Sequence, residues 1–120
     1  MEELGCYLMA LKLMPGETRN YTFKLPDEVA NIDSMLICFF QNDEKILEYT
    51  EAMQDKVFGV ENQPNLIVCI LPREDTLKFE NRMPAKLQME WNIDGRHSVS
   101  KAQRISVGNY LNKEYVEGNV

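Results

Sequence analysis

Histidine and tryptophan are the scarcest residues of this 120-residue chain, with one of each, and cysteine occurs only three times. The three cysteines, Cys6, Cys38 and Cys69, lie far apart without a CxxC pair, which argues against a zinc site. Cys38 and Cys69 fall in strongly apolar runs, where a thiol usually acts as a small hydrophobic side chain. We therefore expect reduced cysteines in a core, and a chain that folds in the cytoplasm.

The sequence also lacks the motifs of several enzyme classes. The motifs GxxxxGK[ST], GxGxxG and GxSxG are missing. We therefore expect no phosphate-binding loop, no dinucleotide-binding site and no nucleophile elbow. His97 cannot form a relay with Ser98 and Asp94, because neighbouring residues on a strand point to opposite faces. The paired acids Asp43-Glu44 and Glu74-Asp75 lack the alternating oxygens and the glycine of a calcium loop. We predict no catalytic residue, no metal, no cofactor and no enzymatic activity.

Long apolar runs and positive charge are also scarce. Lys12 interrupts the run from Leu8 to Met14, and Pro72 ends the run from Leu66, so no segment approaches the ~18 residues of a membrane-spanning helix. The first residues hold glutamates where an export signal has a basic head. With 13 Lys and Arg against 19 Asp and Glu, the net charge of -6 repels nucleic-acid phosphates and anionic lipids on average. We expect a soluble protein without nucleic-acid or membrane partners.

The length and the composition fit one ordinary globular domain. A chain of 120 residues with 44% hydrophobic and 27% charged residues can bury a core without disulfides or metals. No repeat, low-complexity tract or linker divides it. We expect a single domain over residues 1–120, with residues 1–8 and 109–120 peripheral or frayed.

Alternation of apolar and polar residues is the clearest structural signal. In residues 85–94, every second side chain is apolar, which places Trp91 and its alternate neighbours on the buried face of a strand. Asp94 and Gly95 supply the positive φ angles of a tight hairpin turn. Residues 97–107 should therefore return antiparallel beside the first strand, with a bulge or an edge position near Lys101 and Gln103.

Similar patterns predict the other elements. Strands are expected near residues 6–14, 18–25, 34–41, 45–50, 56–60 and 65–71. Residues 72–79 predict a short helical turn, because a proline comes early and Glu74 and Asp75 lie in the first turn. Leu77 and Phe79 are expected to plug one end of the sandwich, and residues 27–32 to form a similar turn. The sequence thus predicts an all-β, antiparallel sandwich of seven or eight strands.

Some methionines and tyrosines are candidate interface residues. Met9 and Met14 belong to an N-terminal strand, which at the margin of a sandwich can add to a neighbouring chain's sheet. Tyr110 and Tyr115 lie in a polar tail that is either frayed or docked on a partner. The other methionines in strand patterns are better explained as core residues.

Residues 71–79, Leu-Pro-Arg-Glu-Asp-Thr-Leu-Lys-Phe, resemble a turn in a family of small proteins encoded in phages and prophages of Gram-positive (Firmicutes) gut bacteria. Residues 16–18 and 21–26 resemble the Gly-x-Thr and Thr-Phe-x-Leu-Pro segments of that family, and residues 40–48 resemble its Gln-Asn segment before an Ile-Leu strand. The likeness runs from about Met9 to Glu117. It departs at Pro72 and Arg73, and residues 1–8 have no counterpart.

The resemblance implies a tail- or baseplate-associated structural protein with an immunoglobulin-like sandwich and no assigned activity. Glu74, Asp75 and Phe79 carry over as structural turn residues only. The predicted function is therefore assembly, with itself or with tail proteins, first in the cytoplasm and then in a virion. One alternative is a carbohydrate- or host-surface-binding module, which needs exposed Tyr or Trp in a concave patch. Another is a small prophage-encoded regulator or inhibitor, which predicts a monomer with a one-sided acidic face.

Overall fold

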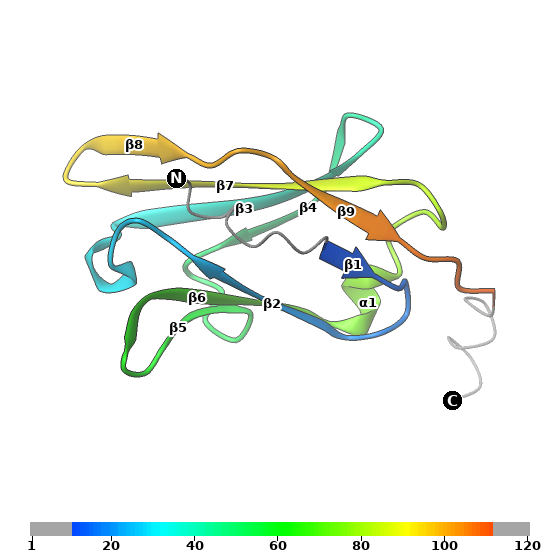
Figure 1. The fold of residues 1–120 in the computed structure, drawn as a ribbon, viewed down its shortest axis with the longest axis horizontal. Helices are drawn as coiled ribbons and strands as arrows, with labels where there is room; N and C mark the ends of the chain where they lie inside the picture. The colour runs from blue at the N-terminus through cyan, green and yellow to red at the C-terminus, as the bar shows by residue number, and fades with distance from the viewer. Residues whose placement is uncertain (1–10, 112–120) are drawn as a thin grey trace.

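The computed structural model describes residues 11–111, which fold into two β-sheets that face each other (Figure 1). The strands in this range are β1 (Leu11–Leu13), β2 (Arg19–Lys24), β3 (Ser34–Gln41), β4 (Glu44–Thr50), β5 (Val57–Val60), β6 (Gln63–Leu71), β7 (Ala85–Ile93), β8 (Arg96–Val99) and β9 (Gln103–Val107). A 3-10 turn, η2 (Val29–Asn31), and a short helix, α1 (Arg73–Thr76), accompany them. The predicted all-β sandwich is confirmed. Among the described residues, no helix is long and apolar enough to cross a membrane.

The order of the strands is that of an immunoglobulin-like sandwich. One sheet has the order β1-β9-β7-β3-β4, with β8 also paired to β7, and the other has the order β2-β6-β5. β2, β6 and β5 take the places of strands B, E and D, while β9, β7, β3 and β4 take those of G, F, C and C′. The β1–β9 pair is parallel, unlike the antiparallel pairing expected throughout. It arises because the chain crosses to the other sheet after β1 instead of turning back in a hairpin.

The predicted return strand, residues 97–107, is divided into β8 and β9, which gives nine strands within residues 11–111 where seven or eight were expected for the chain. Between these strands, Ser100 N–H donates to the Met89 carbonyl at 2.9 Å, and Ser100 Oγ accepts from Met89 N–H at 3.0 Å. The Ser100 hydroxyl oxygen thus accepts the hydrogen bond that a backbone carbonyl would accept in a continuous pair of strands. The interruption lies where the sequence indicated a bulge.

The core lies between the two sheets and follows the predicted alternation. Trp91 is 4% exposed, and Leu87 and Met89 on the same face of β7 are fully buried. Phe39 of β3 packs edge-on against the rings of Tyr49 and Phe79, at centroid distances of 5.9 and 6.0 Å. Cys38 and Cys69 are buried free thiols, as predicted, whereas Cys6 lies outside the described residues.

Helix α1 lies between the sheets at one end of the sandwich (Figure 1). Phe79 behind it is fully buried and Leu77 half-buried, so the predicted plug is confirmed. Gly16 N–H donates to Thr76 Oγ1 at 3.0 Å, and this hydroxyl donates to the Glu17 carbonyl at 2.8 Å. These bonds join α1 to the turn that precedes β2.

Candidate functional site

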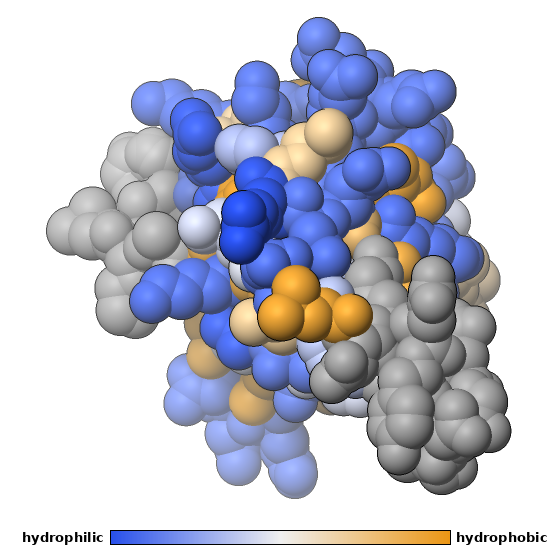
Figure 2. Space-filling view, turned by 90° about the vertical axis from the view of Figure 1, so that its right-hand side faces the viewer, coloured by the Kyte–Doolittle hydropathy of each residue, from blue (hydrophilic) through white to orange (hydrophobic). Residues whose placement is uncertain are grey.

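Two of the four predicted interface residues, Met14 and Tyr110, lie in the described range, near the end of the sandwich that holds α1. Met9 and Tyr115 lie outside it. Met14 is 38% exposed, and its Cε would be 2.7 Å from a Cβ on Gly108. This end has a mostly hydrophilic described surface with small separate hydrophobic patches, as Figure 2 shows. Met14 therefore offers a small apolar contact rather than a broad apolar face.

Tyr110 is half-buried by residues of its own chain. Asn81 forms two hydrogen bonds with the Tyr110 backbone: Asn81 Nδ2 donates to the Tyr110 carbonyl at 3.0 Å, and Asn81 Oδ1 accepts from Tyr110 N–H at 3.1 Å. The ring lies over Gly16, where a Cβ would be 2.7 Å from Tyr110 Cε2. Tyr110 thus fixes the start of the tail on the domain, and part of its ring is already covered.

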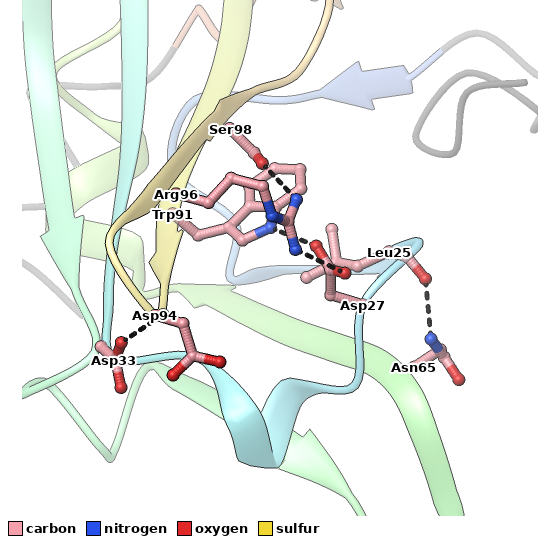
Figure 3. Close-up of polar contacts among 8 residues, drawn as sticks. All are labelled: Leu25, Asp27, Asp33, Asn65, Trp91, Asp94, Arg96 and Ser98. Atoms are coloured by element: carbon pink, nitrogen blue, oxygen red, sulfur yellow. Dashed lines mark hydrogen bonds and ion pairs between the residues drawn. The ribbon is translucent and has the colours of Figure 1, made fainter.

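The opposite end of the sandwich is held together by Asp27, as Figure 3 shows. Its Oδ2 accepts from Trp91 Nε1 at 2.9 Å, and its Oδ1 accepts from Arg96 Nη2 at 3.2 Å. The bond from Trp91, followed by that from Arg96, holds the pKa of Asp27 below its usual value. Sequence analysis missed Asp27, although the need of a buried indole N–H for an acceptor predicts that some such residue exists.

The predicted turn residues Asp94 and Gly95 lie at this same end. Their φ angles are 50° and 80°, and Ile93 pairs with Arg96 across them, so the predicted tight hairpin is confirmed. Asp94 N–H also donates to Asp33 Oδ2 at 2.9 Å, which ties the hairpin to the loop before β3.

Asp75, predicted as a turn residue, is also an acceptor in a buried cluster. Tyr49 Oη donates to Asp75 Oδ2 at 2.6 Å, and Lys78 Nζ lies 3.5 Å from Oδ1. Lys56 Nζ lies 3.9 Å from Oδ2 and 5.7 Å from the centre of the Tyr49 ring. Burial, and then the bond to Asp75, raises the pKa of Tyr49 above its usual value. A phenol held in its neutral form in this way anchors α1 to β4. Glu74 beside it is exposed in the first turn of α1.

His97 contacts residues other than those of a catalytic triad. Its Nδ1 lies 2.8 Å from Asn92 Oδ1 and its Nε2 lies 3.1 Å from Glu90 Oε1. Ser98 Oγ accepts instead from Arg96 Nη1 at 3.2 Å. His97 and Glu90 border an open hollow of about 390 Å³ on the outer face of the larger sheet. The geometry aligns an imidazole with a carboxylate and an amide, which makes a polar surface contact.

A second hollow of about 440 Å³ opens between the two sheets. Its apolar lining comes from η2, the residue that follows it, and strands β3, β5 and β6, namely Val29, Ile32, Met35, Val57, Phe58 and Ile67. Phe58 is 39% exposed, and the side chains of Glu51 and Gln54 complete the rim. Sequence analysis missed this hollow, because it forms only where separate strands come together.

Neither protein-family models nor curated protein sequences give a match to this chain. Within residues 11–111, no group of three or more His, Cys, Asp or Glu side chains is placed to hold a metal ion. The described surface offers the hollow with Phe58 and the edge strands β4 and β5, with charged side chains on β4.

Proposed function

We propose that this protein is a non-enzymatic structural component of a phage or prophage particle, associated with the tail or baseplate. It acts by assembling with copies of itself or with other tail proteins. The observation that carries assembly is the open edge of each sheet. Within residues 11–111, β4 and β5 each pair with a neighbour on one side only. An unpaired edge presents N–H and C=O groups to which another strand can bind.

The open edges are also selective. β4 carries charged side chains at Glu44, Lys45 and Glu48, and β5 has a register shift between Gly59 and Val60. Charges and bulges on an edge disfavour indiscriminate pairing while leaving a complementary partner acceptable. The proposal that this protein belongs to a phage or prophage particle is supported by a sequence resemblance. Residues 16–18, 40–48 and 71–79 resemble the phage family described above.

The burial of Trp91 favours assembly over carbohydrate binding. A sugar-binding face needs exposed aromatic rings, but Trp91 is 4% exposed and its N–H is taken by Asp27. The second candidate, a small regulator or inhibitor, is favoured by the exposed acidic residues of β4 and of the loop before β5, namely Glu44, Glu48, Glu51 and Asp55. It predicts a monomer that binds a basic surface of another protein.

Light scattering coupled to size-exclusion chromatography separates these functions. For assembly, we expect the mass of the full chain to rise above the monomer value of 14.0 kDa as the protein concentration increases. Peptide mass spectrometry of purified, induced particles should also detect the chain. A constant monomer together with absence from particles would overturn the proposed function.

A further inference from the structure

The side of the molecule formed by β4, β5 and their adjoining loops is acidic, and we name it the acidic flank. Its exposed carboxylates are Asp43, Glu44, Glu48, Glu51, Asp55 and Glu61. The two lysines of this flank are already engaged. Lys45 Nζ lies 2.6 Å from Glu48 Oε1, and Lys56 Nζ faces the buried Asp75. Among residues 11–111, most of these carboxylates therefore have no cation paired with them.

The opposite side, formed by β1, β2 and β9, is basic, and we name it the basic flank. Tyr21 Oη of β2 donates to the Lys12 carbonyl of β1 at 2.7 Å, which brings these two strands together. The exposed cations of the flank are Lys12, Lys24, Lys101 and Arg104. Within residues 11–111, the ion pairs involve other cations, such as Arg19 with Glu17 at 3.4 Å. The four exposed cations thus have no carboxylate partner in the described part of the chain.

The two flanks cannot neutralise each other within one molecule. In the larger sheet, β9, β7 and β3 lie between β1 and β4. At the usual spacing of neighbouring strands, this separates the flanks by about 19 Å. That distance is well beyond the screening length of about 8 Å at physiological salt.

We propose that copies of this chain associate through unlike flanks, with the β4 edge of one copy against the basic flank of the next. This inference rests on the proposed function, because it names the partner as a second copy. A two-fold contact of β4 with β4 would bring Glu44 and Glu48 against another acidic edge, and like charges in contact are unfavourable. Only the contact between unlike flanks brings opposite charges together.

The unpaired backbone edges of β4 and β2 and the exposed side chain of Phe58 are also compatible with a contact between unlike flanks. β4 has seven residues and β2 has six, and within the described range each pairs on one side only. Phe58 adds exposed apolar area on the acidic flank. Because the two contacting surfaces differ, the contact is heterologous, and its repetition produces a ring or a helical row rather than a closed dimer.

Two charge-reversal variants test the contact in the full chain. The first, Glu44→Lys with Glu48→Lys, leaves β4 with three lysines and no acidic residue, and the second, Lys12→Glu with Lys24→Glu, places two acidic residues on β1 and β2 of the basic flank. All four side chains are exposed, so circular dichroism should show that the fold is retained. We expect each variant alone to associate at least tenfold more weakly than the wild type in sedimentation velocity. An equimolar mixture of the two should recover wild-type association, because each reversed flank then meets its complement.

The control reverses the same amount of charge elsewhere. Glu28→Lys with Glu80→Lys changes exposed residues in loops outside β4 and should associate like the wild type. If the wild type associates and either reversal variant matches it, or if the mixture fails to recover, the contact between unlike flanks is overturned while assembly stands. If the wild type is a monomer at every concentration, self-assembly and this inference both fail.

Discussion

Asp27 and Trp91 are 64 residues apart in the sequence, yet the Asp27 carboxylate accepts a hydrogen bond from the Trp91 indole at 2.9 Å. The bond joins the loop after β2 to the strand that carries the core tryptophan. Asn65 Nδ2 supports the same loop by donating to the Leu25 carbonyl at 3.0 Å (Figure 3). One carboxylate thus satisfies a buried donor and closes the end of the sandwich opposite α1.

Replacing Asp27 with alanine should destabilise the fold, because the buried Trp91 N–H then loses its acceptor. We expect the free energy of unfolding to fall by about 1–3 kcal/mol. Urea unfolding followed by tryptophan fluorescence measures the loss. The matched control is Glu28→Ala, because the Glu28 side chain caps no backbone group and should leave stability nearly unchanged. Equal stabilities for the two variants would contradict the role assigned to Asp27.

The charge of Asp27 should also make stability depend on acid pH. Its pKa is lowered in the folded state, so its contribution is complete above the usual carboxyl pKa and is lost as the pH falls through the folded value. Asp27→Asn keeps an acceptor but removes the charge. We expect the stability difference between wild type and Asp27→Asn to shrink below about pH 4, measured by urea unfolding across a pH series. A difference that is constant with pH would exclude this linkage.

The strands could be predicted because alternation is a local property of the sequence. β3 has the predicted limits, residues 34–41, and β7 ends one residue before its predicted limit. The partners of polar side chains could not be predicted in this way. Gln41 ends an apolar run, yet its buried amide donates to the carbonyls of Glu80 and Met83 at 3.1 and 2.8 Å. The parallel β1–β9 pair and the charged flanks likewise depend on which distant strands meet.

The buried thiols should be unreactive in the folded protein. Burial raises the pKa of Cys69 to about 12 and also raises that of Cys38. A thiol reagent attacks the thiolate, so both groups should react only when the protein unfolds. In a Cys6→Ser variant, which removes the thiol outside the described residues, we expect labelling to follow the unfolding rate. Fast labelling under native conditions would contradict the burial of these cysteines.

Tyr21 should make the fold sensitive to alkaline pH. Burial raises its pKa to about 12, against the usual value of 10.0, so the unfolded state ionises first. Its stabilising contribution is present below about pH 10 and is lost as the pH rises through the folded value. We expect phenolate absorbance of Tyr21 to appear together with unfolding. Tyr21→Phe should have a weaker pH dependence between about pH 10 and 12, and an unchanged profile would refute this.

Gly16 should tolerate substitution less well than Gly95, although both have positive φ angles, of 98° and 80°. At Gly95 an added Cβ meets no atom within 4 Å, so Gly95→Ala reports backbone strain alone. At Gly16 the added Cβ would also lie 2.7 Å from the Tyr110 ring. The ring must then move, although Asn81 holds the Tyr110 backbone by hydrogen bonds. We expect Gly16→Ala to lower the melting temperature more than Gly95→Ala does, and Tyr110→Ala to reduce this excess. Equal effects in the two alanine variants would show that Tyr110 does not rest on Gly16.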